Sequence, residues 1–277
     1  MHIHISSEHN ILDLKLKETW QYRNLIWLFT KRSFQVSYKQ TILGPLWLFI
    51  NPLLTGIVYV ILFGNIAKLS TDGVPMLLFY LSGNAIWSYF SSCFTNNSST
   101  FTSNARLFGK VYFPRLTIPI STVLSAMGRW AIQMILVTIL AIYYIARGSL
   151  HPNWAALLLV PFVLLWLGML GLGCGIIVSS MTTKYRDLNV LVGFGIQLWM
   201  YATPVVYPMS TISAKWLKTV LTINPVTAPI EIFRYAILGT GTVYASCVAV
   251  SLAITLVVTV LGIIVFNKVE RTFMDTV

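Results

Sequence analysis

The sequence predicts an all-α membrane protein with six transmembrane helices, and three observations support this prediction. Hydrophobic residues make up 56% of the chain and charged residues only 10%, whereas about a quarter of the residues in a soluble domain are charged. The apolar residues fall in long runs, and a helix of roughly 20 such residues crosses the hydrocarbon layer of a bilayer. The basic residues lie mostly between these runs.

Six apolar segments define the domain organisation. A cytoplasmic tail and an interfacial helix occupy residues 1–45, a transmembrane domain occupies 46–266, and a second cytoplasmic tail occupies 267–277. The six predicted spans are 46–66, 75–95, 117–146, 154–181, 190–207 and 243–266.

The charge pattern predicts that both termini are cytoplasmic. With that orientation, 13 of the 19 basic residues lie in inner segments, five lie in outer segments, and Arg129 lies within a span. An excess of lysine and arginine on the inner side is the usual mark of membrane topology. Topology therefore explains the net charge of +11, and we expect no nucleic-acid partner.

Residues 18–29 predict an amphipathic helix before the first span. One helical face carries Tyr22, Leu25, Ile26 and Phe29. Two tryptophans in the same segment favour a position at the membrane interface. We therefore expect a helix that lies against the membrane lipid in the inner headgroup layer.

Two prolines, each with the residue before it, shape the first span: Gly44-Pro45 and Asn51-Pro52. Gly44 permits a sharp bend, and Pro45 fits the first turn of a helix, where its missing N–H costs nothing. Pro52 removes a backbone hydrogen bond and should kink the helix beside Asn51. A kink next to an amide fits either a cavity or simple helix packing.

Residues 208–241 predict a helical hairpin on the outer side. Its two pieces, 211–222 and 226–238, are joined by Asn224 and Pro225. Each is about 12 residues, or ~18 Å of helix, and is too short to span a bilayer. Both ends must lie outside if six spans are correct. We therefore expect a re-entrant or interfacial hairpin that is buried in protein or lines water.

Polar side chains recur at helical spacing within the predicted spans. Spacings of three and four place them on one face, and such faces avoid lipid. Serine and threonine could bond between helices, whereas the combined amides and aromatic residues favour a wet path. The candidates for this path are Asn51, Tyr59, Tyr80, Asn84, Trp87, Ser88, Phe90, Ser91, Arg129, Gln197, Trp199 and Tyr201.

Arg129 is predicted to lie near the middle of the membrane. A charge there is costly and is usually functional. Its partner could be Glu231 on the outer hairpin, or else water and carbonyl groups. The sequence leaves a structural ion pair and a substrate contact equally open.

The sequence contains no sign of catalytic or metal chemistry. It lacks the G-x-x-x-x-G-K-[ST] pattern of a P-loop. The GLGCG segment at residues 171–175 lies deep in an apolar run, which predicts close helix packing. We expect no catalytic residue, no metal and no disulfide between the scattered cysteines Cys93, Cys174 and Cys247.

Five motifs in order resemble the Wzm-type membrane subunits of ABC-2 type polysaccharide exporters. They are RSFQVSYKQTILGPLWLFINPLL (32–54), KVYFPRLTIP (110–119), KYRDLN (184–189), TPVVYP (203–208) and INPVTAPIEIFR (223–234). The resemblance covers about residues 20 to 266. Ser33 departs from the pattern, since many family members carry an acidic residue there.

The resemblance implies a transport subunit without a cofactor of its own. Two copies of the chain would form a channel, and two copies of a separate ATPase subunit would bind ATP and Mg²⁺. The cargo would be a polysaccharide linked to undecaprenyl pyrophosphate. Of the three cargoes in the family, O antigen, capsule and teichoic acid, we expect O antigen. The chain would then lie in the bacterial inner membrane.

The same resemblance assigns roles to charged and loop residues. The headgroup of the lipid carrier would be attracted by Lys31, Arg32 and Lys39. Coupling to the ATPase would involve Arg106, Lys110, Arg115, Tyr185, Arg186 and Asp187, and the inner loop 98–115 should contain a short docking helix. The outer gate would contain Asn224, Pro225, Glu231 and Arg234.

Two other function classes remain as alternatives. An ABC-2 exporter of drugs or lipids would favour a narrower and more apolar lining. A membrane glycosyltransferase that uses a polyprenyl carrier would need carboxylates near the interface, and the nearest candidates, Asp72, Asp187 and Glu231, are scattered.

Overall fold

The computed structural model describes residues 16–36, 39, 42–182, 185 and 187–276. Over these ranges the chain folds into helices joined by short loops, with no β-strand. The predicted all-α class is therefore confirmed for the described part of the chain.

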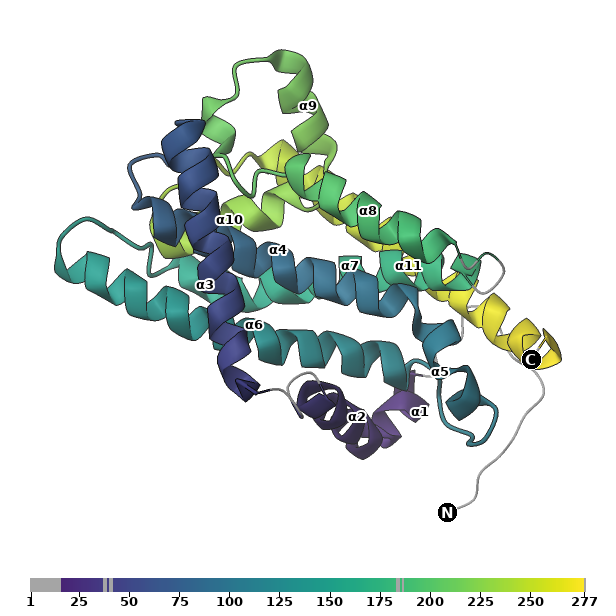
Figure 1. The fold of residues 1–277 in the computed structure, drawn as a ribbon. Helices are drawn as coiled ribbons and strands as arrows, with labels where there is room; N and C mark the ends of the chain where they lie inside the picture. The colour runs from purple at the N-terminus through teal and green to yellow at the C-terminus, as the bar shows by residue number, and fades with distance from the viewer. Residues whose placement is uncertain (1–15, 37–38, 40–41, 183–184, 186, 277) are drawn as a thin grey trace.

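The longer helices form a bundle around two central ones (Figure 1). Helices α4 (Met76–Ser98) and α7 (Val160–Thr182) pack against each other at its centre. Around them lie α3 (Trp47–Tyr59), α6 (Thr117–Ala146), α8 (Leu188–Tyr201) and α11 (Ala245–Thr276).

Glycines allow the central helices to approach closely, as the GLGCG segment predicts. A Cβ added at Gly171 of α7 would lie only 2.6 Å from the Cβ of Cys93 on α4. On another face of α7, a Cβ added at Gly262 of α11 would lie 2.9 Å from the carbonyl oxygen of Gly173. Side chains at these positions would push the helices apart, so the glycines serve packing.

The predicted amphipathic helix is present in two pieces. Helices α1 (Leu16–Gln21) and α2 (Arg23–Val36) meet at Tyr22. Ile26 is buried, whereas Trp27 is 66% exposed. Helix α2 packs along α6, where the Thr30 hydroxyl donates a hydrogen bond to the Ser121 carbonyl at 3.3 Å. The apolar face thus packs on the chain itself, and Trp27 remains free to meet the headgroup layer.

The first span begins with the predicted bend. Gly44 has a φ of +50°, and Pro45 lies in the short 3₁₀ turn η1 (Gly44–Leu46) that leads into α3. Helix α3 continues through Pro52 and then widens into π-helical turns, η2 (Val60–Ile66). Such turns are rare and often occur at functional sites.

Four helical segments are long and apolar enough to cross a membrane. They are Gly44–Ile66, Thr117–Ala146, Ala156–Thr182 and Ala245–Val269, the third of which includes the short turn η3 (Ala156–Leu159). Helix α4 has 23 residues, or about 34 Å of helix, but its polar side chains lower its hydropathy. Helix α8 has 14 residues and ends at Tyr201. The chain is therefore a multi-pass membrane protein, and the count of six spans stays a prediction.

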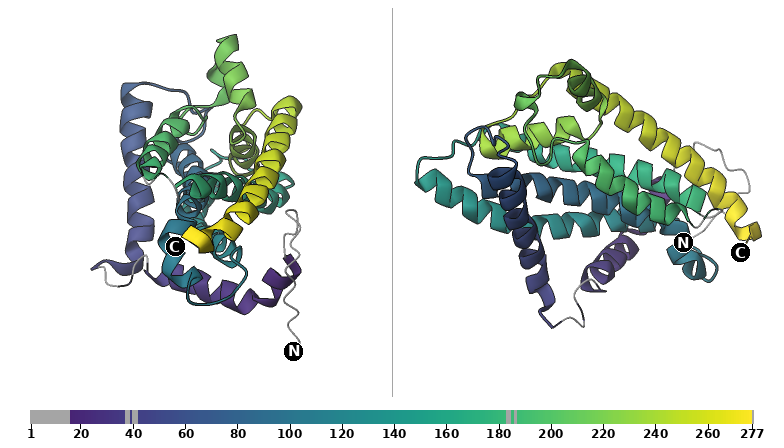
Figure 2. Two further views of the ribbon diagram at one scale, coloured as in Figure 1. Left: turned by 90° about the vertical axis from the view of Figure 1, so that its right-hand side faces the viewer. Right: turned by 45° about the horizontal axis from the view of Figure 1, so that its top comes forward.

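Two short helices follow α8, as the hairpin prediction expects. After the turn η4 (Met209–Thr211) come α9 (Lys215–Ile223) and α10 (Thr227–Leu238). Helix α10 is buried along nearly its whole length against α4, α7 and α11, whereas α9 projects from the bundle (Figure 2). Whether this hairpin re-enters the bilayer stays a prediction.

The loop 98–115 contains the predicted short helix, α5 (Thr100–Phe108). The ring of Phe101 stacks on Phe266 of α11, with their centroids 5.0 Å apart. Figure 1 places α5 and the C-terminal end of α11 at one end of the bundle, opposite α9. We call the end with α5 the inner end and the end with α9 the outer end, following the predicted orientation.

Candidate functional site

The polar stripe of α4 combines buried aromatic residues with half-buried amide and hydroxyl side chains. Tyr80 and Trp87 are buried inside the chain, with exposed fractions of 0% and 5%. Asn84, Ser88 and Ser91 are half-buried, and within the described residues no hydrogen bond of these three side chains is found. They therefore remain available to water, to a cargo or to a second chain.

Two of the predicted lining aromatics hold α8 against α4. Phe90 has no exposed surface, and its ring meets the Trp199 ring edge-to-face at 5.2 Å between centroids. The Trp199 indole Nε1 donates a hydrogen bond to Asn224 Oδ1 at 3.1 Å. In this conformation both rings serve mainly to position the helix.

Helices α3 and α8 both lie against α4 and meet at their outer ends. The Tyr59 hydroxyl of α3 lies 3.5 Å from the Met200 sulfur of α8, and the Tyr59 ring is 6.2 Å from the Tyr80 ring of α4. The structure therefore brings together path candidates from three predicted spans. The exposed members are Asn51, Gln197 and Tyr201.

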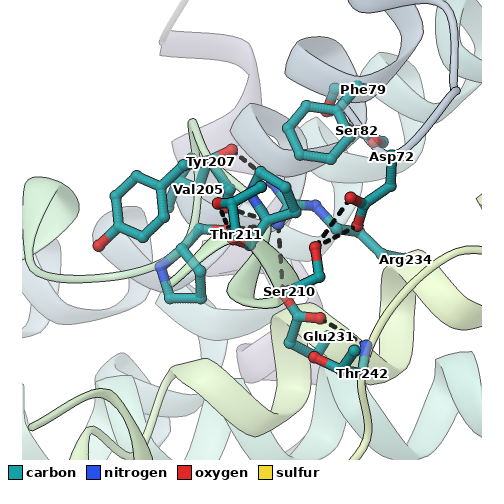
Figure 3. Close-up of polar contacts among 12 residues, drawn as sticks. Asp72, Phe79, Ser82, Val205, Tyr207, Ser210, Thr211, Glu231, Arg234 and Thr242 are labelled. Carbon is teal, nitrogen blue, oxygen red and sulfur yellow. Dashed lines mark hydrogen bonds and ion pairs between the residues drawn. The ribbon is translucent and has the colours of Figure 1, made fainter. Parts of the chain in front are cut away.

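A buried arginine organises the outer end of the bundle. Arg234 of α10 is 1% exposed, and Figure 3 shows it among the loop that follows α8. Its Nη1 donates hydrogen bonds to the carbonyls of Pro204 at 2.6 Å and Tyr207 at 3.3 Å, and its Nη2 donates to Val205 at 2.5 Å. We call Arg234, Glu231 and these three carbonyls the Arg234 cluster.

The fifth helix is shorter than predicted, and the Arg234 cluster binds the backbone beyond its end. The sequence prediction extends the span to residue 207, but α8 ends at Tyr201. Beyond that point the carbonyls face Arg234 instead of continuing the helix. Gly83 of α4 permits this approach, since a Cβ there would lie 2.6 Å from the Val205 oxygen. Hydropathy alone does not show this end, but Pro204 was a local signal, because a proline disfavours the helical conformation of the residue before it.

Glu231 completes the charge balance of the cluster. Its Oε1 lies 3.4 Å from Arg234 Nη1, and its Oε2 accepts a hydrogen bond from the Thr242 backbone N–H at 2.9 Å. Burial lowers the pKa of the Arg234 guanidinium, and the Glu231 carboxylate opposes that shift. Glu231 is therefore committed to Arg234 and is not the partner of Arg129.

Both the amide nitrogen and the amide oxygen of the Asn224 side chain form hydrogen bonds that join α8 to α10. Its Nδ2 donates to the Ala202 carbonyl at 2.9 Å and to the Thr203 hydroxyl at 2.8 Å. Its Oδ1 accepts hydrogen bonds from Trp199 and from the backbone N–H of Val226, both at 3.1 Å. A side chain with four bonds of this kind fixes the connection between the two helices.

The remaining outer contacts tie separate loops together. The Ser210 hydroxyl lies 2.8 Å from each carboxylate oxygen of Asp72, which precedes α4 (Figure 3). The Pro225 carbonyl accepts a hydrogen bond from Ser251 of α11. The residues predicted to form the outer gate are thus the ones that connect the outer loops, and their movement in gating stays a prediction.

Arg129 lines a pocket, and within the described part of the chain it forms no ion pair with an acid. Its Nη1 donates a hydrogen bond to the Ser125 hydroxyl, one turn earlier on α6, at 3.0 Å. The pocket has a volume of about 450 Å³, and Arg32 of α2 also lines it. The stretch NNSSTFTSN at residues 96–104 supplies further polar lining. This stretch was not among the predicted site residues, although its run of amides and hydroxyls next to a span was a signal in the sequence.

The basic residues of the inner end have different surroundings. Arg115 is buried, with its guanidinium carbon 5.5 Å from the centroid of the Phe108 ring, so it supports α5 from within. Arg186 lies outside the described residues. The exposed members of the predicted headgroup and coupling sets are Lys31, Arg32, Lys39, Arg106, Lys110, Tyr185 and Asp187.

Comparisons with known proteins agree on one family. The family model described as ABC-2 type transporter matches residues 24–238. A protein of Klebsiella pneumoniae named O-antigen export system permease protein RfbA is 27% identical over 265 residues, which are 95% of this chain and 99% of that protein. A protein of the same name from Myxococcus xanthus is 30% identical over 211 residues, which are 76% of this chain and 78% of that protein.

Proposed function

Because the chain belongs to the ABC-2 type transporter family, we propose that it is the membrane permease subunit of an exporter of O antigen. Its place is the bacterial inner membrane, and its cargo is a polysaccharide linked to undecaprenyl pyrophosphate. The relatives named O-antigen permeases, which match most of the chain, support this cargo.

The observation that carries the proposal is the unbonded polar face of α4. Asn84, Ser88 and Ser91 lie in a helix of a membrane bundle and make no hydrogen bond among the described residues. A lipid-facing helix would not tolerate them, because each unpaired polar group in hydrocarbon costs several kcal/mol. Water or a hydroxyl-rich cargo satisfies them, so this face borders the translocation path.

The cargo also suits the side chains around α4. Sugars offer hydroxyl groups for amides and serines, and they offer apolar C–H faces for aromatic rings. Asn51 and Gln197 provide exposed amides on α3 and α8, and Tyr59 and Tyr201 provide rings. A drug or lipid cargo would not need this density of polar groups.

We further propose a homodimer, in which a second copy covers the α4 face whose Asn84, Ser88 and Ser91 are half-buried in the single chain. The chain spans the membrane six times with both termini cytoplasmic, and the hairpin of α9 and α10 re-enters from the outside. The length of α4 supports the count of six spans. The position of α5 and the end of α11 at the same end of the bundle supports a cytoplasmic C-terminus (Figure 1).

Two copies of a separate ATPase subunit bind ATP and Mg²⁺ at the inner end. Helix α5 presents Arg106 toward solvent, and Lys110 follows it in an exposed loop. The connection between α7 and α8 contains Tyr185, Arg186 and Asp187. Because it is short, it transmits the movement of the ATPase directly to these two helices.

The outer end forms the gate in this proposal. The buried hairpin helix α10 and the loop after α8 move together, because Asn224 and Arg234 bind them to each other. The exposed contact between Asp72 and Ser210 is the contact that separates when the path opens.

Deletion of the gene tests this function. Surface O antigen should disappear and the finished, lipid-linked polymer should accumulate inside the cell, as measured by immunoblotting of surface and cytoplasmic fractions. Plasmid-borne wild-type chain should restore export. Normal surface polymer in the deletion strain would refute the proposal, and an internal polymer of altered composition would indicate an enzyme instead.

A further inference from the structure

The pocket beside Arg129 has a composition that matches one kind of ligand. Arg129 projects from α6 and Arg32 from α2, and both line the pocket. Among the described lining residues there is no carboxylate to neutralise the two guanidinium groups. A pocket that gathers two positive charges without a negative one favours an anion.

The uncharged lining adds hydrogen-bonding groups to this charge. Amides and hydroxyls from three separate segments face the pocket, among them Asn96, Ser103, Asn104 and Ser125. Guanidinium groups bind phosphate oxygens in a fixed fork geometry, and amides and hydroxyls complete such sites. The donor set therefore fits a phosphate or pyrophosphate group better than a lone carboxylate.

One edge of the pocket is apolar. Phe29 and Val36 of α2 line it beside Arg32, and α2 is the helix whose exposed tryptophan suits the headgroup layer. An anion with an attached hydrocarbon chain would place its charge against the arginines and its chain along this edge. A free inorganic anion would leave the apolar edge unused.

We propose that this pocket binds the phosphate-bearing headgroup of an amphiphile, with Arg129 and Arg32 as the residues that contact its oxygens. The identity of this amphiphile as the polyprenyl pyrophosphate end of the cargo rests on the proposed function. The assignment gives Arg129 a role that the path along α4 does not use. It also gives the Arg129 guanidinium a partner beyond the Ser125 hydroxyl, which accepts its one hydrogen bond within the described residues.

Equilibrium binding to the purified full-length chain, together with its ATPase when the two copurify, tests the proposal. The probes are farnesyl pyrophosphate, farnesol, inorganic pyrophosphate and phosphatidylglycerol, measured by microscale thermophoresis in detergent. Farnesyl pyrophosphate should bind about tenfold or more tightly than farnesol or inorganic pyrophosphate, since only it satisfies both the charge and the apolar edge. Equal binding of inorganic pyrophosphate would overturn the amphiphile, and equal binding of phosphatidylglycerol would overturn the cargo as its source.

Arginine substitutions locate the binding. Arg129→Gln and Arg32→Gln should each weaken farnesyl pyrophosphate about tenfold, whereas Arg147→Gln, at the exposed outer end of the same helix α6, should leave it unchanged. Arg32 is exposed, so its variant tests the site even if Arg129→Gln fails to fold. Unchanged binding in the Arg32 variant would refute the pocket, whether or not the Arg129 variant folds.

The binding result and the deletion result separate the two proposals. Binding that depends on Arg32 and Arg129, in a protein whose deletion leaves surface polysaccharide intact, would support the pocket and refute the proposed cargo. If the deletion strain loses export but the arginine substitutions leave binding unchanged, the function is supported and the pocket is refuted.

Discussion

Arg234 and Arg129 both lie within the helical bundle, but their surroundings differ. Arg234 donates to three backbone carbonyls, lies near Glu231, and has its guanidinium carbon 4.0 Å from the centroid of the Phe79 ring. Among the described residues, Arg129 donates one hydrogen bond, to the Ser125 hydroxyl, and it lines a pocket.

The difference separates a structural charge from a charge that is available to a ligand. Removing a charge from water is costly unless the protein itself supplies partners. The chain supplies Arg234 with carbonyls and a carboxylate, whereas among the described residues it supplies Arg129 with the Ser125 hydroxyl. The same distinction applies to amides, since Asn224 makes four hydrogen bonds and Asn84 makes none among the described residues.

Substitution of Arg234 should give the largest loss of stability. Arg234→Met leaves Glu231 and three carbonyls without their partner, and breaking a buried pair costs about 3–5 kcal/mol. We expect little folded protein, measured as the monodisperse fraction on size-exclusion chromatography and by thermal unfolding in detergent. Arg147→Met, at an exposed site, serves as the control. A variant as stable as the wild type would show that the outer cluster is not structural.

Substitution of Asn224 should have a smaller effect of the same kind. Asn224→Ala leaves the Trp199 indole and the Val226 N–H without an acceptor, at about 1–3 kcal/mol. Thermal unfolding in detergent should show a clear loss of stability with some folded protein remaining. If Asn84→Ala destabilised the protein as much, the contrast between the two amides would fail.

The sequence predicted those parts of the fold that depend on local pattern. The predicted span 117–146 coincides with α6, Thr117–Ala146. The bend at Gly44, the short helix α5 and the packing role of Gly171 also follow from local chemistry.

Features that depend on distant segments could not be predicted in this way. The carbonyls that follow α8, which ends at Tyr201, accept hydrogen bonds from Arg234, 33 residues further on. The pocket combines α2, residues 96–104 and α6, which are far apart in sequence. The spacing of Glu231 and Arg234, three residues apart on one helix, was a signal for their ion pair.

The contact between Asp72 and Ser210 should matter less for stability than for gating. It is exposed, so Asp72→Ala should cost less than about 1 kcal/mol. If this contact separates during opening, the variant should raise the leak of a small ion from proteoliposomes, measured by fluorescence quenching. Ser210→Ala should reproduce the effect. If neither variant changes the leak, the contact between Asp72 and Ser210 has no part in gating.

Substitution within the α4 stripe should change stability least and transport most. Asn84→Leu and Ser88→Ala remove polar groups that have no partner in the described chain, so unfolding should shift by no more than about 0.5 kcal/mol. Export of O antigen should nevertheless fall, as measured by surface immunoblotting. Marked destabilisation with normal export would indicate that the stripe is buried packing.

Thiol accessibility along α4 tests the central claim, that this face borders the path. Single cysteines are placed at Asn84, Ser88 and Ser91 in a chain without its native cysteines, with Ile86 and Phe90, both fully buried, as controls. A water-soluble thiol reagent should label the three stripe positions and spare the two controls, and labelling should increase during ATP turnover. Protection of all five positions in every state would contradict the account and place the path elsewhere.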